Sequence, residues 1–420
     1  MLAGNVSVEA AILRSRALLR HDRTSEAISE LNATAPSLGQ HRLSAEHRIT
    51  ISLALIKNGR YESAAEAITE ADVYATFVKD PELTGEVEYA KAFGAFAKRD
   101  YAETNKIAFS ALDPRAPIAT GRLLGSIALV AGLSGNHLEQ ISYFQQSIES
   151  LQSAPQRDYY LEAHALNNLA IPAAELNPMG VREFIAAKYE SIAWDTENAT
   201  LQSLILQHLA WLDALHGDHL SAFGRFRQAS RLSSDNSLRA LALIGRAFLA
   251  REMDELLTAA ECLADAHSFI TDIDQTGAAF VETSVLLGLA SLTAYTDVAR
   301  ASALLDTYAA SKAQLDSSYI AAHANPINQA VEFHAYGLVA VAKNELDDGI
   351  ARLRDAHKLF ISIGSTWRAA IVALDIYDIT HEDDMLVFAR EQAARVPHSW
   401  LARRLSQTIP PPVLYKDVVA

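Results

Sequence analysis

Turn-forming, aromatic and small residues interrupt the apolar stretches of the chain in an order that recurs. A glycine is followed two positions later by a ring, and ten positions after that ring stands a small residue. The series are Gly59, Tyr61 and Ala71; Gly135, His137 and Ser147; and Gly217, His219 and Ala229. A turn between two stretches of helical length, with a small residue at a constant distance behind it, predicts two antiparallel helices that cross closely.

The same register extends over eight units. The small residues expected in the first helix of each unit are Ser52, Ala92, Ala128, Ala170, Ala210, Ala247, Ala290 and Gly337. Seven positions later stands a turn former in every unit except at Arg99, and nineteen positions later a small residue in every unit except at Tyr189. A degenerate unit with Ser15, Asp22 and Ala27 in matching places precedes them. The register therefore predicts helical pairs along nearly the whole chain.

This pattern resembles the tetratricopeptide repeat (TPR), in which two antiparallel helices form each unit. The successive units are 36 to 47 residues apart, whereas the standard repeat has about 34, so the chain is closest in style to the MalT-like sensor solenoids of bacterial transcription regulators. The resemblance implies an all-α, right-handed superhelix of about nine to ten helix pairs, a TPR-like α-solenoid. We expect residues 1–405 to form this array and residues 406–420 to form a proline-rich tail.

Two regions are expected to depart from the regular repeat. The helical segments Thr366–Ile379 and Asp383–Leu405 lack the small-residue pattern, which suits a terminal capping pair. Ile171-Pro172 and Asn177-Pro178 indicate a disturbed turn in the fourth of the eight units, and the bulky Tyr189 follows it.

Composition and charge narrow the function classes. Glycine and proline together number 30 of 420 residues, which favours helices over a many-turned β fold. The chain has 36 basic and 51 acidic residues, a net charge of −15, so direct nucleic-acid binding is not expected. The N-terminal residues lack the pattern of a secretory signal, and the longest uncharged stretches, Leu123–Leu138 and Thr283–Thr296, are shorter than a membrane span. We expect a soluble, cytoplasmic protein.

Candidate chemistry is sparse. We find no phosphate-binding glycine loop, no nucleophile elbow and no zinc-binding helix motif, so no enzyme activity, cofactor or metal is expected. His219 lies near His216 and His208, but it occupies the place of the packing ring. The run His381-Glu382-Asp383-Asp384 falls where a helix begins, a position that favours carboxylates. Cys262, the single cysteine, is expected to be a small buried residue.

In the TPR-like architecture the first helix of each pair lines a concave groove. The residues expected to face this groove and to bind a ligand or peptide are Tyr89, Phe93, Arg122, His164, Asn167, Gln207, Trp211, Phe248 and His334. Trp211 is the expected central anchor, because tryptophan is the residue most enriched at binding hot spots. The alternative for each aromatic residue is packing between repeats. The two-carboxylate clamp of co-chaperones is not expected, since Asn167 lacks its lysine and arginine partners.

A basic island lies in the fifth and sixth units, where six arginines from Arg225 to Arg251 stand with one acidic residue, Asp235. Arg225, Arg227 and Arg231 form a candidate docking patch for an acidic partner. The alternative is a solvated outer face that pairs with acidic neighbours.

The leading functional hypothesis is a non-catalytic scaffold that binds a protein or peptide in its concave groove. The alternative is a ligand-sensing regulatory module, MalT-like, that lacks its own DNA-binding domain and responds to a small-molecule effector or peptide. Peptide-sensing regulators of Gram-positive bacteria are disfavoured, because Val6–Arg20 already resembles a repeat helix where they carry a DNA-binding domain. An enzyme of the α/α-toroid type would require ring closure with converging carboxylates. The sequence leaves open whether the protein forms a homo-oligomer.

Overall fold

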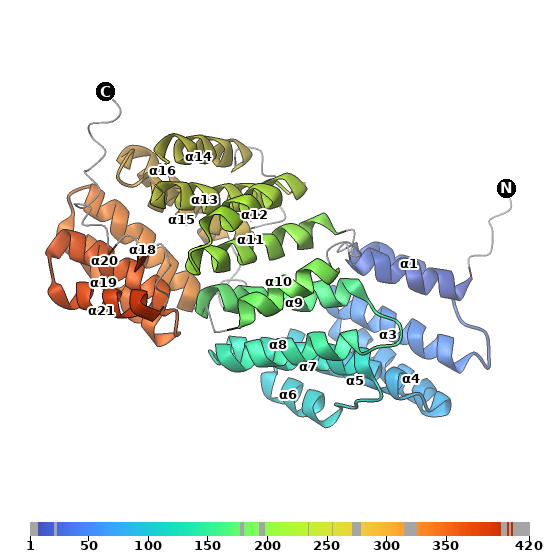
Figure 1. Cartoon of the computed structure of the whole chain (residues 1–420). Coiled ribbons are helices and arrows are strands. Elements are labelled where there is room, and N and C mark those ends of the chain that lie inside the picture. The colour runs from blue at the N-terminus through green and yellow to red at the C-terminus, as the bar shows by residue number, and fades with distance from the viewer. Residues whose placement is uncertain are drawn as a thin grey trace. The chain divides into compact units, whose positions relative to one another are not determined.

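The computed structural model describes residues 7–20, 23–176, 180–192, 198–233, 235–253, 255–270, 279–314, 326–395, 401, 402 and 405. Within these ranges the chain forms 20 helices and no strand, as expected of an all-α fold (Figure 1). The chain divides into two compact units, residues 1–169 and residues 170–420. None of the described helices is both long and apolar enough to cross a membrane.

Unit 1 consists of antiparallel helix pairs, each packed along its length, followed by the first part of α9. Its helices are α1 (Val8–Arg20), α2 (Thr24–Asn32), α3 (His41–Lys57), α4 (Tyr61–Val78), α5 (Pro81–Ala97), α6 (Tyr101–Ser110), α7 (Pro117–Leu133), α8 (His137–Gln152) and α9 (Tyr159–Leu176).

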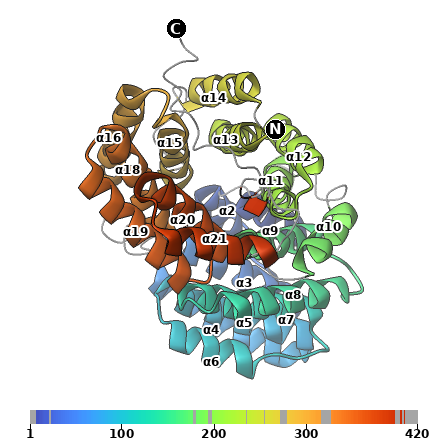
Figure 2. The same cartoon turned by 60° about the vertical axis from the view of Figure 1, so that its left-hand side comes forward.

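Unit 2 continues the same arrangement from the end of α9. Its helices are α10 (Val181–Ile192), α11 (Ala199–Leu215), α12 (His219–Leu232), α13 (Asn236–Glu252), α14 (Leu256–Ile270), α15 (Ala279–Thr293), α16 (Val298–Gln314), α18 (Pro326–Ala342), α19 (Leu346–Ser362), α20 (Thr366–Thr380) and α21 (Asp383–Arg395). The last two helices are the expected terminal pair, and they lie at the front in Figure 2. The expected tail, residues 406–420, falls outside the described residues.

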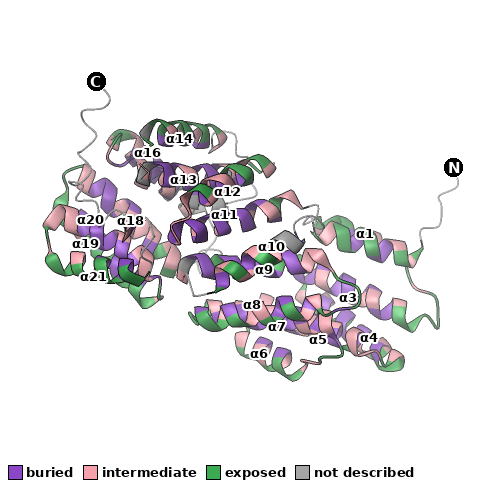
Figure 3. Cartoon of the chain, viewed as in Figure 1, coloured by how far each residue is buried: buried purple, intermediate pink, exposed green. Residues whose placement is uncertain are grey.

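The small first-helix residues of the register lie where the helices of a pair cross. All eight first-helix positions are buried, and seven of them are alanine or serine with at most 1% exposure. The degenerate first unit follows the same rule, because the hydroxyl of buried Ser15 donates to the carbonyl of buried Ala27 across the crossing. Figure 3 shows that buried residues follow the sides of the helices that face a neighbour. The predicted TPR-like pairing is confirmed.

The turns inside the pairs share a left-handed residue at the predicted place. Gly59, Gly135 and Gly217 have φ of 75°, 81° and 81°, a region that glycine enters without steric cost. Arg99, the exception in the sequence register, adopts the same conformation with φ of 64°. The turn geometry is therefore retained even where the residue is unsuited to it.

The register is wrong in the seventh unit. Ala309, nineteen positions after Ala290, is exposed, and its neighbour Tyr308 is buried instead. Asp297 caps the second helix of this pair by accepting a hydrogen bond of 2.9 Å from the N–H of Arg300. Asp297 stands seven positions after the small residue Ala290. In the pair that contains Gly217, the capping residue Asp218 stands eight positions after the small residue Ala210. The shorter turn shifts the buried position by one residue.

The disturbed turn expected in the fourth unit does not interrupt the helix at Ile171-Pro172. Helix α9 continues through Pro172, and Tyr189 in α10 packs against an apolar cluster of Leu206, Ala229 and Ala242. Asn177-Pro178 falls outside the described residues.

The first helices form the inner layer of each unit. In unit 1, α1 contacts α3, α3 contacts α5 and α5 contacts α7; in unit 2, α11 contacts α13, α13 contacts α15 and α15 contacts α18. Second helices of successive pairs touch one another at most marginally in the described parts of the chain. Helices that lie closer together occupy the smaller radius of a curved array, so the first helices carry the concave side.

Candidate functional site

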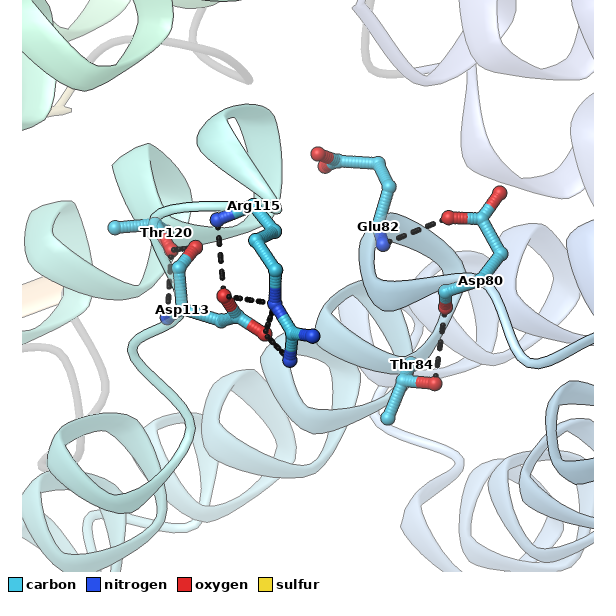
Figure 4. A network of polar contacts seen from close by, with 6 residues as sticks. All are labelled: Asp80, Glu82, Thr84, Asp113, Arg115 and Thr120. Atoms are coloured by element: carbon cyan, nitrogen blue, oxygen red, sulfur yellow. Dashed lines mark hydrogen bonds and ion pairs between the residues drawn. The ribbon is translucent and has the colours of Figure 1, made fainter.

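The ends of α5 and α7 are fixed by polar contacts at their N-termini (Figure 4). Asp80 accepts a hydrogen bond of 2.9 Å from the N–H of Glu82 and caps α5. No side chain caps α7 from its own N-cap residue, Ala116; instead the carboxylate of Glu82 accepts hydrogen bonds from the N–H groups of Ile118 and Ala119, at 3.3 and 2.6 Å. Burial raises the pKa of Glu82, although these N–H groups favour its ionised form. The contacts set the register between the two helices.

That register brings an ion pair onto the concave side of unit 1. Glu86 in α5 pairs with Arg122 in α7, and their side chains are 15% and 19% exposed. The guanidinium of Arg122 lies 3.8 Å from the ring centroid of Tyr89, which stacks on Phe93 at 5.9 Å. Burial disfavours the charged guanidinium, but the carboxylate of Glu86 offsets this and raises the pKa of Arg122. Tyr89, Phe93 and Arg122 thus form one cluster.

His164 belongs to a second cluster, where α9 meets the end of α1. Its Nε2 lies 2.9 Å from the hydroxyl of Tyr160, which donates to the carbonyl of Arg20 at 3.2 Å. The guanidinium of Arg20 stacks over the Tyr160 ring at 4.6 Å and forms an ion pair with Asp158. We call these contacts of Arg20 with Asp158 and Tyr160 the polar clasp. It joins residues 138 positions apart, so the row of first helices in unit 1 bends until its ends touch.

Asn167 lies one turn beyond His164 in α9. It is buried, and its Oδ1 has no hydrogen-bond partner. A buried acceptor without a partner costs about 1–3 kcal/mol, so it marks hydrogen-bonding capacity that the fold leaves unused.

The expected anchor Trp211 is surrounded by other rings of unit 2. Its ring centroid lies 5.4 Å from those of Phe226 and Phe248 and 6.3 Å from that of Trp367. Trp367 comes from α20, and its Nε1–H donates to the carbonyl of Ala174 at 3.1 Å. That carbonyl lies in the last turn of α9, where backbone carbonyls have no intrahelical donor. Phe248 also packs against the apolar cluster between α20 and α21.

The other groove residues predicted in unit 2 have internal partners as well. The side-chain amide of Gln207 donates to the carbonyl of Leu238 at 3.2 Å. His334 lies 2.8 Å from the carboxylate of Asp375 in α20. Helix α20, or the cluster that it forms with α21, therefore contacts Trp211, Phe248 and His334, three of the predicted groove residues of unit 2.

The candidate docking patch separates into two kinds of residue. Arg227 and Arg231 are exposed, whereas Arg225 lies 3.2 Å from the carboxylate of the fully buried Asp213. Arg182 binds the same carboxylate at 2.8 Å. Burial raises the pKa of Asp213, and the two arginines oppose that shift. Arg225 is thus part of a buried charge cluster that joins α10, α11 and α12.

No group of three histidine, cysteine or carboxylate side chains among the described residues could hold a metal. Asp383 and Asp384 occupy the first turn of α21, as their helix-start position predicted. Cys262 is 3% exposed and lies in the core of unit 2, and burial raises its pKa. The carboxylates of Glu86 and Asp158 are each paired with an arginine.

Sequence reasoning missed Arg20, Asp158, Tyr160 and Trp367. Each acts across a separation of more than a hundred residues, and no local motif surrounds it. The weak signals were a tyrosine pair at the start of a first helix and a tryptophan in the capping unit.

No family model matches the chain, and no curated protein matches it. Among solved structures, the apo form of RapI is 11% identical, with a TM-score of 0.53 over 84% of this chain and 98% of RapI. The apo form of the quorum sensor NprR from B. thuringiensis is 14% identical, with a TM-score of 0.49 over 85% and 98%. A Rap protein complexed with competence and sporulation factor is 12% identical, with a TM-score of 0.44 over 91% and 99%.

The likeness to RapI shows the fold, and the chain is a TPR-like helical solenoid. The MalT-like style of the resemblance stays a hypothesis.

Proposed function

We propose that the protein is a non-catalytic scaffold that binds a peptide or a protein segment on the concave side of unit 1. The binding residues in this proposal are Tyr89, Phe93, Arg122, His164 and Asn167, from α5, α7 and α9.

The observation that carries the proposal is the ion pair of Glu86 and Arg122 with the rings of Tyr89 and Phe93 beneath and beside it. These side chains are partly exposed, and the capped ends of two helices hold them in place. Rigid elements that present aromatic and hydrogen-bonding groups together are typical of a binding site.

Unit 2 is the weaker candidate, because the side chains of Trp211, Phe248 and His334 already contact α20 or its neighbours. A ligand there would have to displace part of the fold. In the alternative, the protein is a regulatory module. It would bind its ligand on the same face of unit 1, and a partner chain would supply the DNA-binding domain.

A random 12-residue peptide display library, selected on the immobilised full chain, tests the proposal. Enriched peptides are synthesised and titrated against the wild type and Tyr89→Ala by fluorescence anisotropy. We expect Tyr89→Ala to weaken binding at least tenfold, since removal of an interface ring costs about 2 kcal/mol. The matched control is Tyr143→Ala, which removes a partly exposed tyrosine from the second helix α8.

Trp211→Ala is a second control, at a predicted groove residue of unit 2. Its folded fraction, measured by urea unfolding, should bind with unchanged affinity, because Trp211 lies in unit 2. Peptides that bind Tyr89→Ala as tightly as the wild type, or a library without enrichment, would overturn the proposal.

A further inference from the structure

Two rows of opposite polarity cross the first helices of unit 1. The positions six before each buried small residue hold polar side chains, and the positions one after it hold apolar ones. The polar row is Glu46, Glu86, Arg122 and His164, and the apolar row in α3, α5 and α7 is Leu53, Phe93 and Leu129. Seven residues separate the rows on each helix, which is nearly two turns, so both lie on one face about 10.5 Å apart.

The equivalent positions in unit 2 carry no charged or histidine side chain. They hold Leu204 in α11, Leu241 in α13, Ser284 in α15 and Val331 in α18. Leu241 and Val331 pack against the core of that unit. The polarity of the rows is therefore a property of unit 1, and helix geometry alone does not require it.

Each charged side chain of the polar row lies beside a side chain of opposite charge. Glu86 and Arg122 face each other, and Glu46 lies 3.7 Å from Arg42, which also pairs with Asp80. A ligand carboxylate at the centre of the row would meet Glu86, and a ligand ammonium would meet Arg122. Desolvation of an additional charge is costly without a free partner, so the row disfavours ligands of either sign.

The same ion pair retains unused hydrogen-bonding capacity of both kinds. Oε1 of Glu86 is a buried acceptor without a partner, and Nε of Arg122 is a buried donor without one. A carboxamide or a peptide group offers one donor side and one acceptor side, which is the complement of this pair. Both atoms are buried, so a bound amide would reach them only if the two side chains rotate.

We infer that the ligand is an amphipathic peptide whose polar edge is uncharged. Amide or hydroxyl groups of its polar edge lie against Glu86, Arg122 and His164, and apolar side chains lie against Phe93 and Leu129. This inference rests on the proposed function and specifies which class of peptide the face accepts. The two edges of the ligand are about 10 Å apart, the distance between the rows.

Three synthetic peptide sublibraries test the inference without a known ligand. All three vary Ala, Val, Leu and Phe at the same apolar positions, and their polar positions hold either Asn, Gln, Ser and Thr, or Asp and Glu, or Lys and Arg. Each is passed over the immobilised full chain at about 0.3 M salt, where the Debye length is below 8 Å and the net charge of −15 is screened. We expect at least tenfold greater retention of the uncharged sublibrary.

Charge-neutralising variants show whether the ion pair sets this preference. Glu86→Gln leaves Arg122 unpaired and should raise retention of the acidic sublibrary at least tenfold, whereas Arg122→Gln should do the same for the basic one. The double variant, Glu86→Gln with Arg122→Gln, leaves no buried charge unpaired and should keep the uncharged preference. It also covers the case in which a single variant fails to fold.

The matched control is Glu103→Gln or Lys106→Gln, which neutralises an exposed ion pair of 2.9 Å on the second helix α6 and should change nothing. A wild type that prefers charged peptides, or a double variant with a charge preference, would overturn the inference. If the inference fails in this way but Tyr89→Ala still abolishes retention of the peptides, the proposed function stands and only the inference about peptide charge is wrong. If Tyr89→Ala has no effect, both fail.

Discussion

The two units bring distant helices together by different chemistry. In unit 1 the end of α1 meets the start of α9 through the polar clasp, whose Arg20 and Asp158 side chains are 39% and 27% exposed. In unit 2 the last helical pair meets α9, α11 and α13 through the rings of Trp211, Phe248 and Trp367. An exposed ion pair contributes about 0–1 kcal/mol, whereas a packed aromatic side chain contributes several.

The two sets of contacts also differ in where they lie relative to the predicted groove residues. The polar clasp of unit 1 costs little free energy to break. It lies beside His164, on the proposed binding face. The closure of unit 2 is part of its core, and it uses the first-helix positions that would otherwise face a ligand. The same repeat pattern therefore leaves the proposed binding face partly exposed in unit 1, whereas the corresponding side chains of unit 2 have internal partners.

The largest expected effect comes from removing the closure of unit 2. Trp367→Ala should lower the free energy of unfolding by about 3–5 kcal/mol, because it leaves a cavity and an unpaired carbonyl at Ala174. Arg20→Ala in the clasp of unit 1 should cost about 1 kcal/mol or less. Urea unfolding followed by circular dichroism measures both.

Trp367→Phe is the control, since it keeps a ring and removes only the N–H donor. Its expected cost is between those of the other two variants. Equal costs for Trp367→Ala and Arg20→Ala would erase the distinction between the two closures.

Overpacking a helix crossing should have the next largest effect. Ala222 is fully buried in α12, so Ala222→Leu should destabilise the protein by about 1–3 kcal/mol. Ala64 in α4, which is 1% exposed, is the equivalent test in unit 1. Ala309→Leu is the matched control: the sequence register predicts a crossing there, whereas the residue is exposed. A shift of the urea midpoint at Ala309 and none at Ala222 would reverse our assignment of the register.

Acid should destabilise both units through buried histidines. Burial lowers the pKa of His47 in unit 1 and of His357 in unit 2, and each ring lies 2.9 Å from a backbone carbonyl. Below about pH 6.5 the unfolded chain binds a proton that the native histidine does not, so stability is present above that pH and is lost as the pH falls. Each histidine contributes up to about 1.4 kcal/mol per pH unit.

Urea midpoints at pH 7 and pH 5 measure this loss. His47→Gln and His357→Gln should each remove part of the dependence on pH while retaining a polar side chain. A dependence that is unaffected by both substitutions would place its origin elsewhere.

The smallest expected effect concerns a turn of unit 1. Arg99 holds the left-handed conformation that glycine holds at the equivalent turns, so Arg99→Gly should stabilise the protein by about 0.5–1 kcal/mol. Gly59→Ala in unit 1 and Gly217→Ala in unit 2 should each destabilise it by about 1 kcal/mol. Differential scanning calorimetry resolves changes of this size. A lower Tm for Arg99→Gly would mean that the arginine side chain has a role beyond the turn.

The sequence predicted the local architecture well, because the contacts between the two helices of a pair join residues close in the chain. Ser52 and Ala71 lie nineteen residues apart, and the turn between them fixes their crossing. The prediction failed where a turn changed length, as at Asp297, since a shift of one residue rotates a helix by about 100°.

The predicted groove residues differ in the contacts that they make. Tyr89, Phe93 and Arg122 lie together because they occupy register positions on adjacent first helices. Gln207 and Trp211 were predicted by the same rule, yet each has internal partners. The rule assigns residues to one side of a helix, and it contains no information on whether another helix covers that side.

The sequence by itself determined the helix pairs, their turns and the small residues at their crossings, because all of these depend on interactions within about forty residues. It also determined that charged residues and a histidine line the first helices of unit 1, where unit 2 has mostly apolar ones. Only the tertiary structure decided which faces stay open. The contacts of Arg20 with Asp158 and of Trp367 with Ala174 join residues 138 and 193 positions apart. Such contacts depend on the accumulated rotation of several repeats, and small differences in each repeat decide where distant helices meet.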